Sequence, residues 1–308
     1  MTQSIKLLSS ISLVLLCLVS RAQDLKLAGI EYLSYPKVKF KDDASGKQAA
    51  FNEAGAFISF PKLLQDKKTI LVNGIQYGMV QTSIYNDALS SKNEMTFHKV
   101  SYSFTYIRRF NEKWTFIGRL SPTLASDFED KLSWHDFILQ GNVMITKKFN
   151  ENVVGGAGLI YTMRFGKPLL FPSIQYQYKK DSHALNIYLP IFVNYTYQTG
   201  SENKVGLGFR AAVNGANFNA SSKSFSSDTE MDRFNYARAN IGPFVNYQLT
   251  KTLLIEASGG LSTMRMYQFE DVAGSKHKYD SESGGFFNIG IVLLPPRPKK
   301  QLAPEAQE

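Results

Sequence analysis

Apolar and polar residues alternate along much of the chain with a period of two. Between 98 and 106 the even positions carry Val100, Tyr102 and Phe104, whereas the odd positions are serine, threonine or lysine. A period of two places successive side chains on opposite faces of a β-strand. The pattern recurs in the segments 114–124, 137–149, 173–179 and 205–214. The chain is therefore predicted to be β-rich throughout.

The length of these segments separates two kinds of β-protein. Strands of soluble proteins average about five or six residues, whereas a tilted strand needs about 9 to 11 residues to cross a bilayer. Many of the segments reach the longer value, and aromatic residues such as Trp114, Phe149 and Tyr161 lie near their ends, as in an interfacial girdle. Closing long strands into a cylinder also removes exposed edges. The pattern indicates a transmembrane β-barrel.

A short polar turn is used twice at a fixed interval. The segment Phe110-Asn111-Glu112 returns 39 residues later as Phe149-Asn150-Glu151. Similar short turns are predicted at 65–68, 179–182 and 249–251, and longer polar segments alternate with them at 41–50, 86–95, 125–133, 217–233 and 270–283. This order is that of an up-and-down meander, with the short turns on the periplasmic rim and the long segments on the cell exterior.

The strand count depends on how the segment 184–198 is divided. If this segment is one strand, the barrel has thirteen strands, which conflicts with the even number found in single-chain bacterial barrels. A break at Leu189-Pro190 gives fourteen, and proline is poorly tolerated inside a central strand. Removing the segment 25–32 from the wall gives twelve instead. Fourteen is favoured.

The amino terminus predicts export. Lys6 precedes an apolar run over 7–19, and Ser20-Arg21-Ala22 presents small residues at the two positions that signal peptidase reads. Residues 1–22 are therefore predicted to be a signal peptide, which leaves Gln23 first. The one cysteine, Cys17, lies inside the apolar run. The mature chain is then expected to contain no thiol, disulfide or thiolate metal site.

The basic charge adds little about partners. The formal charge of +9 falls to +7 when Lys6 and Arg21 are removed with the signal peptide. The remaining basic residues are scattered along strands and turns, and an exported protein rarely meets nucleic acid, so no nucleic-acid partner is expected. The expected partners are outer-membrane lipids, the barrel-insertion machinery during biogenesis and a small anionic solute.

Four features together resemble the uncharacterised outer-membrane β-barrel families common in Bacteroidota. They are the signal peptide ending in Ala22-Gln23, the Phe-Asn-Glu turns, the Leu189-Pro190 step and the glycine-rich aromatic last strand over 284–294. The resemblance spans nearly the whole mature chain and implies no established activity or site residues. The chain departs from many such barrels in continuing past its last strand, and residues 295–308 are predicted to be a flexible tail rich in proline and lysine.

Candidate catalytic residues are few. The histidines His98, His135, His183 and His277 lie far apart and form no two-histidine metal pair, so no metal or other cofactor is predicted. Ser133, His135 and Asp136 lie together in or beside a predicted exterior loop, which keeps a lipid hydrolase as an alternative. The chain lacks a Gly-x-Ser-x-Gly elbow. A non-enzymatic role is therefore favoured.

The most informative polar residues are those predicted to face the lumen. Alternation directs Arg119, Arg164, Arg210 and Arg238 inward, with Glu256 and Glu53 as candidate acidic partners. In one interpretation the arginines form an aqueous path that prefers anions, because a guanidinium group keeps its charge and binds carboxylate or phosphate. In the other they pair with carboxylates and fill a narrow barrel as a structural core.

The sequence thus predicts an all-β protein whose fold is an up-and-down antiparallel transmembrane β-barrel of about 12 to 14 strands over residues 23–294. The expected location is the outer membrane of a Gram-negative cell. Three functions stay open: a narrow pore for small anionic solutes, a plugged structural or surface-interaction barrel whose exterior loops bind a partner, and an outer-membrane lipid hydrolase. An exported soluble β-protein is the rival to all three.

Overall fold

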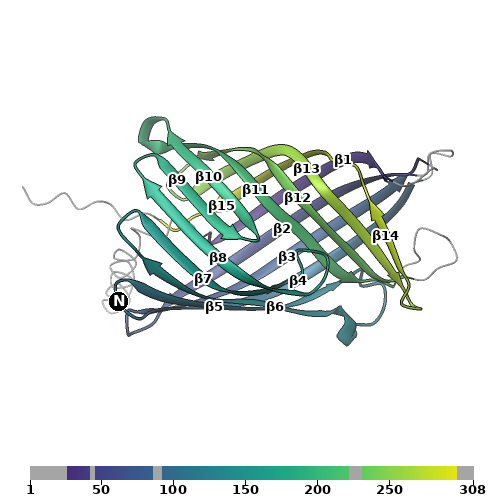
Figure 1. The fold of residues 1–308 in the computed structure, drawn as a ribbon, viewed down its shortest axis with the longest axis horizontal. Coiled ribbons are helices and arrows are strands. Elements are labelled where there is room, and N and C mark those ends of the chain that lie inside the picture. The colour runs from purple at the N-terminus through teal and green to yellow at the C-terminus, as the bar shows by residue number, and fades with distance from the viewer. Residues whose placement is uncertain (1–25, 42–45, 86–91, 222–230, 297–308) are drawn as a thin grey trace, which may run out of the picture.

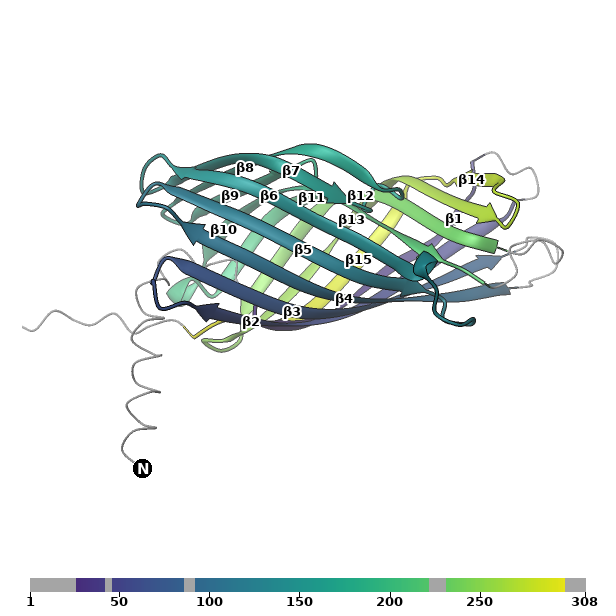
Figure 2. The same ribbon diagram turned by 90° about the horizontal axis from the view of Figure 1, so that it is seen from below.

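The computed structural model describes residues 26–41, 46–85, 92–221 and 231–296, which form one closed antiparallel barrel (Figures 1 and 2). The predicted signal peptide and most of the predicted tail lie outside these residues. No helix in the described ranges is long and apolar enough to cross a membrane. The strands are β1 Ala28–Lys39, β2 Gln48–Leu63, β3 Thr69–Tyr85, β4 Lys92–Arg109, β5 Trp114–Ser126, β6 Phe137–Lys148, β7 Val153–Thr162, β8 Leu169–Lys180, β9 His183–Leu189, β10 Phe192–Thr199, β11 Val205–Asn219, β12 Met231–Gln248, β13 Leu253–Asp271, β14 Lys276–Asp280 and β15 Gly284–Leu293, with short 3₁₀ turns η1 Trp134–Asp136 and η2 Ser201–Asn203.

The first and last strands close the cylinder. From β1 to β14 each strand pairs with its neighbour in the chain, and β1 also pairs with β15, with Ala28 opposite Leu293. The short strand β14 and the strand β15 pair with successive stretches of β13, so they fill one position in the wall. The result is a barrel of fourteen strands. The predicted fold class is confirmed.

The break at Leu189-Pro190 resolves the strand count as predicted. The peptide bond there is cis, and the Ile191 N–H donates to the Tyr188 carbonyl oxygen at 2.7 Å, which closes a tight turn between β9 and β10. The first segment stays in the wall as β1. Fourteen is therefore the correct count, and the alternative of twelve is wrong.

The repeated turn is explained by its asparagine. The Asn111 side-chain oxygen accepts hydrogen bonds from the backbone N–H groups of Lys113 and Trp114, both at 2.9 Å. Asn150 repeats this role, because its side-chain oxygen accepts from the Asn152 N–H at 2.9 Å. Such a side chain satisfies backbone donors that a tight hairpin leaves unpaired. The predicted short turns all lie at one end of the barrel, here named the turn end, and the opposite end is named the loop end.

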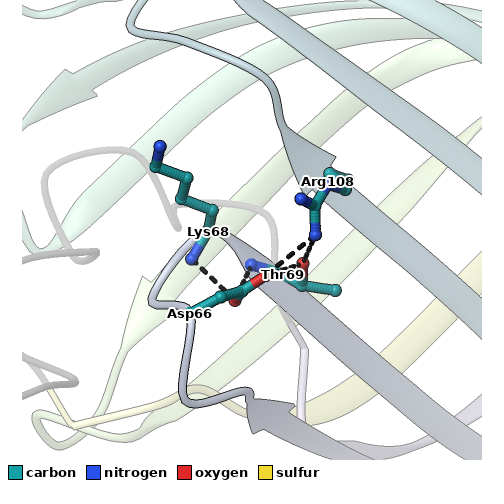
Figure 3. Close-up of polar contacts among 4 residues, drawn as sticks. All are labelled: Asp66, Lys68, Thr69 and Arg108. Carbon is teal, nitrogen blue, oxygen red and sulfur yellow. Dashed lines mark hydrogen bonds and ion pairs between the residues drawn. The ribbon is translucent and has the colours of Figure 1, made fainter.

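Asp66 performs the same task in the turn between β2 and β3 (Figure 3). Its carboxylate accepts from the Thr69 hydroxyl at 2.6 Å, from the Lys68 and Thr69 N–H groups at 3.0 and 2.9 Å, and from the Arg108 guanidinium at 2.8 Å. The Thr69 hydroxyl and the Lys68 N–H are the main causes that lower the pKa of Asp66 from 3.8 to about 2. The charged form is therefore the one that the turn stabilises.

The predicted loop at 270–283 is partly wrong. It contains the strand β14, which pairs with β13 from Met266 opposite Asp280 to Glu270 opposite Lys276. This strand lacks apolar alternation, since its sequence is Lys-His-Lys-Tyr-Asp. It is held by its backbone partner rather than by a buried face, so the hydrophobic pattern does not reveal it.

The outer face is apolar only in the half nearer the turn end. There the outward side chains include Ile58, Phe60 and Ile75, with exposed fractions of 43%, 54% and 53%. Farther toward the loop end, the outward positions of β3 and β13 carry polar residues such as Gln81 and Gln268. The strands from β6 to β10 end near this change, whereas β1 to β4 and β11 to β13 continue beyond it (Figures 1 and 2). An apolar belt of this kind is the surface that a bilayer covers.

Beyond the ends of β6 to β10, the longer strands form a smaller closed tube, because β5 and β11 meet there. β5 and β11 meet in a parallel contact at Ser126 and Asn219. The Asp127 N–H donates to the Asn219 carbonyl oxygen at 3.3 Å, and the Asp127 carboxylate accepts from the N–H of Ser221 at 2.7 Å and from its hydroxyl at 2.9 Å. This β5–β11 seam makes the loop end a narrower tube than the rest of the barrel.

Apolar side chains fill this narrower tube. They form one buried cluster, here named the aromatic core: Leu33, Tyr35, Phe40, Ala49, Phe51, Val80, Ile84, Met95, Phe97, Ala125, Ile138, Ala216, Phe218, Ala220, Met231, Phe234, Tyr236, Tyr267 and Phe269. Phe51 stacks on Tyr267 with ring centroids 4.3 Å apart, and Phe234 lies 4.8 Å from Phe97 and 4.9 Å from Phe269. The loop end is therefore closed along the barrel axis.

Truncating the centre of the aromatic core should destabilise the barrel strongly. Phe234 is 0% exposed, and Phe234→Ala is expected to lower the free energy of unfolding by about 3–5 kcal/mol because it removes buried contacts and leaves a cavity. Urea unfolding in lipid vesicles measures the change. Phe110→Ala, at a 55% exposed position on the turn end, is the control and should cost far less. Equal losses would contradict a packed core at the loop end.

The Asp66 turn should give the barrel an acid-sensitive contribution to stability. The folded pKa lies below the unfolded value, so this contribution is present above pH 3.8 and is lost as the pH falls toward about 2. Asp66→Asn should be less stable than the wild type at pH 6, and the difference should shrink below pH 4 and vanish near about pH 2. Thermal unfolding followed by the heat-dependent gel shift at each pH measures it. A difference that does not depend on pH would exclude the charged form as its source.

Candidate functional site

The interior between the aromatic core and the turn end is polar and open to solvent. Arg119 lies on the same face of β5 as the buried Ser121 and Thr123, so it points inward, yet it is exposed. Glu31 on β1 is likewise directed inward between the outward Ile30 and Tyr32 and is exposed. Inward side chains can be exposed only where the barrel contains accessible space. This region is here named the chamber.

Glycines on neighbouring strands leave room for the long charged side chains of the chamber. Glu31 is paired across the sheet with Gly55 on one side and Gly290 on the other. A methyl group added to Gly55 would lie 3.3 Å from the Glu31 Cγ, and one added to Gly78 would lie 3.4 Å from the Lys99 Cε. The charged chains therefore lie along the wall over glycine, which keeps the middle of the chamber free.

Arg238 forms the boundary between the aromatic core and the chamber. Its side chain is fully buried and pairs with Glu53. The guanidinium carbon lies 3.6 Å from the Tyr35 ring centroid and 4.5 Å from that of Tyr236, and Asn240 donates to the Tyr35 hydroxyl at 2.8 Å. Stacking on aromatic faces and pairing with a carboxylate compensate the charge for loss of water. Arg238 thus acts as a structural residue.

Arg210 and Glu256 also form an ion pair. Glu256 accepts a hydrogen bond from Lys26, and its other oxygen lies 3.6 Å from the Arg210 guanidinium. Arg210 donates from Nε to the Asn194 side-chain oxygen at 3.1 Å and lies 4.9 Å from the Phe244 ring centroid. These groups border a cavity of about 70 Å³. The charge of Glu256 is therefore divided between two cations.

Arg119, Arg164 and Lys99 form a second cationic group in the chamber. The charge of Arg164 acts on both Arg119 and Lys99, so each of these two residues lies within electrostatic range of Arg164. Glu31 is the carboxylate that acts on both Lys99 and Arg164. Three cations facing one carboxylate leave an excess of positive charge. This excess, unlike the paired Arg210 and Arg238, can act on a solute.

Arg164 reaches this group from outside the strands. Alternation places it on a strand, but the structure places it in the loop over 163–168 between β7 and β8. Its guanidinium donates to the Val213 carbonyl oxygen at 3.3 Å and to the Asn214 side-chain oxygen at 3.4 Å. The strand assignment behind the prediction is wrong because β7 ends at Thr162, and Arg164 reaches Asn214 of β11 from a loop.

The candidate hydrolase residues hold a turn together. The Ser133 hydroxyl accepts from the His135 N–H at 3.1 Å, and Asp136 accepts from the Ser133 N–H at 2.5 Å and from the Asn219 side chain at 2.9 Å. Burial raises the pKa of Asp136, but the hydrogen bonds from Ser133, Ser126 and Asn219 outweigh it and lower the pKa below 3.8. Asp136 thus links η1 to the β5–β11 seam, since one of its carboxylate oxygens accepts from Ser133 and the other from Asn219.

Glu31, Lys99 and Arg265 are charged residues of the interior that were not among the predicted site residues. Lys99 could have been found, because alternation in β4 directs it inward. Arg265 could not have been found from alternation. The register between β12 and β13 shifts between Ala237 and Ala239 because β13 has one extra residue there, next to Met264, whose φ is 50°. A bulge reverses the alternation beyond it. Arg265 is consequently 1% exposed and donates to the Gly285 carbonyl oxygen at 2.8 Å, while Met264 is 78% exposed.

The family comparison covers almost the whole barrel. Residues 21–292 match the model of the family described as Domain of unknown function (DUF6268). The chain belongs to this family. The expectation of a family without an established activity is thereby confirmed, and the Bacteroidota origin stays a prediction. No curated protein matches the chain.

Solved structures with a similar fold include outer-membrane channels. An outer membrane channel from Pseudomonas putida F1 has a TM-score of 0.45 and 9% identity, covering 89% of this chain and 97% of that one. The Pseudomonas putida toluene transporter TodX has a TM-score of 0.41 and 10% identity, covering 89% and 90%. An Escherichia coli outer membrane phospholipase A has a TM-score of 0.33 and 11% identity, covering 91% and 96%.

Removing the partner of the buried Arg238 should be costly. Glu53→Gln leaves a buried guanidinium without its counter-charge, and the free energy of unfolding is expected to fall by about 3–5 kcal/mol. Glu151→Gln is the matched control, because Glu151 pairs with Lys148 at an 84% exposed position in a turn and should cost about 0–1 kcal/mol. Urea unfolding in lipid vesicles compares the two variants. Similar small losses would show that Arg238 does not depend on Glu53.

Proposed function

We propose that this protein is an integral outer-membrane barrel that binds small anionic solutes in its chamber and lets them pass. The single observation that carries the proposal is the cationic group of Arg119, Arg164 and Lys99, which faces accessible space with Glu31 as the carboxylate acting on it. A cation in a water-filled lumen with low-dielectric walls attracts anions and repels cations.

Two features support the outer membrane as the location. The apolar belt of the outer face fits a bilayer, and the turn end and loop end differ as the periplasmic and exterior ends of such barrels do. In this orientation the aromatic core lies outside the cell and the chamber lies within the membrane. Outer-membrane lipids and the barrel-insertion machinery are the partners that follow from this location.

The aromatic core favours a second candidate function, a plugged structural or surface-interaction barrel. Its side chains are almost completely buried, as Phe97 and Phe234 show with exposed fractions of 0%, so an axial path would require them to move. A plugged barrel would use its exterior loops to bind a partner and would neither bind nor pass anions. The two functions therefore differ in a measurable property of the chamber.

Charge removal in the chamber should weaken anion binding and selectivity. Arg119→Ala is expected to reduce chloride-over-potassium permeability in planar bilayers several-fold, and to reduce binding of phosphate measured by calorimetry in detergent. Lys147→Ala removes the same charge from the outer face, where Lys147 lies 5.3 Å from the Trp114 ring centroid, and should change neither. Absence of both current and phosphate binding in the wild type would favour the plugged barrel.

A further inference from the structure

The wall of the barrel has a break beside β11. Pairing between β10 and β11 ends at Phe192 opposite Ala212, followed by a 2.9 Å hydrogen bond from the Val213 N–H to the Ile191 carbonyl oxygen. The next strand contact of this edge is with β5 at Asn219. Among the described residues, no strand pairs with 214–218 on this side. This stretch is named the wall break.

The wall break extends from the chamber to the aromatic core: Asn214 at its start accepts a hydrogen bond from Arg164, whereas Ala216 and Phe218 farther along belong to the aromatic core. It begins at the turn that joins β9 to β10 and stops at the β5–β11 seam (Figure 1). The same level marks the end of the apolar belt on the outer face. A solute leaving the chamber at the Asn214–Gly215 end of the wall break would reach the outer surface of the membrane beside the aromatic core, without crossing the whole of it.

The loop over 163–168 covers the wall break. Arg164 holds it there through the hydrogen bonds to Val213 and Asn214. The contact is close, because a methyl group added to Gly215 would lie 2.3 Å from the Arg164 carbonyl oxygen. The two hydrogen bonds are long, at 3.3 and 3.4 Å, and both are donated by the exposed side chain of Arg164. The rest of the loop is held by Met163, which packs against the aromatic core, and by the buried Gly166, so Arg164 supplies the side-chain hydrogen bonds that hold the cover to the edge of β11.

Aromatic rings surround the wall break on the chamber side. Phe165 of the loop lies 4.9 Å from the ring of Phe171, and Tyr188 lies 5.9 Å from Phe192, measured between ring centroids. Phe171, Tyr188 and Phe192 face inward by the alternation of β8, β9 and β10. The phenol of Tyr188 lies within electrostatic range of Arg119 and Arg164. Apolar rings and cations are thus next to each other.

We infer that anions carrying an apolar part, such as aromatic carboxylates, pass between the chamber and the exterior through the wall break, with the 163–168 loop as its cover. The inference rests on the proposed function and adds the route and the solute class. The carboxylate would meet Arg119 and Arg164, while the apolar part would contact Phe171 and Phe192. A small anion gains only the first interaction, and a neutral aromatic gains only the second.

The route can be tested with a cysteine in the chamber. Asn142 lies opposite Arg119 in the pairing of β5 with β6, and Asn142→Cys in a Cys17→Ser background presents one thiol. The protein is reconstituted into vesicles loaded with glutathione, which are captured through an affinity tag inserted at the exposed Gly274 of the loop end. Anionic sulfonatoethyl methanethiosulfonate is added outside. The rate of modification reports access from the loop end.

Variants of the cover should change this rate, and variants elsewhere should not. Arg164→Ala removes the two hydrogen bonds, and Gly215→Ala pushes the loop away, so each is expected to raise the rate several-fold. Gly242→Ala is the matched control for strain, because its added methyl would meet the Gly259 carbonyl oxygen at 2.0 Å away from the wall break. Phe269→Ala loosens the aromatic core and should leave the rate unchanged.

The solute class is tested in the same vesicles by competition. Benzoate should slow the modification several-fold more than acetate or benzyl alcohol at equal concentration. A rate raised by Phe269→Ala but not by Arg164→Ala or Gly215→Ala would overturn the lateral route, and equal effects of benzoate and acetate would overturn the solute class. Equal rates with the cationic trimethylammonioethyl reagent would instead contradict the anion preference of the proposed function and leave the route supported.

Discussion

The requirement that every strand edge find a partner organises this molecule. In a bilayer an unpaired backbone donor or acceptor costs several kcal/mol, so the sheet must close. β10 ends at Thr199 after starting at Phe192, whereas β11 runs from Val205 to Asn219 and extends beyond its neighbour. Its free edge is met by β5 at Ser126 and by the loop that carries Arg164. The narrowed loop end, its aromatic core and the covered wall break all result from this mismatch in strand length.

The charges of the interior divide according to their distance from the aromatic core. Arg238 is enclosed by Tyr35 and Tyr236 and depends on Glu53, which is the arrangement expected of a structural ion pair. Arg119 remains exposed to the chamber and has Arg164 among its charged surroundings, and Arg164 in turn acts on Lys99. The structural interpretation of the arginines therefore fits Arg238, whereas the anion-path interpretation of Arg119 stays a proposal. An aromatic lining decides which charge is enclosed and which remains available to a solute.

The sequence is sufficient for the fold and for part of the site. Alternation predicts the strands and the inward direction of Arg119, and Leu189-Pro190 predicts the division of β9 from β10, because these features are local. The seam between β5 and β11 joins residues 126 and 219 and has no local pattern. The bulge that turns Arg265 inward is likewise invisible, since one extra residue reverses alternation without a distinctive side chain. The wall break could not be predicted because it follows from relative strand lengths.

The asparagine turns at Asn111 and Asn150 complete their hydrogen bonds within three residues, so these hairpins can form before distant strands meet. Two contacts cannot form in this way: Ala28 with Leu293 in the wall, and Ser126 with Asn219 in the seam. Contacts between residues far apart in sequence form late because the chain must first lose the entropy of the intervening segment. Assembly of this barrel therefore ends in two separate closures, one inside the apolar belt and one beyond it, and the second completes the loop end around its aromatic core.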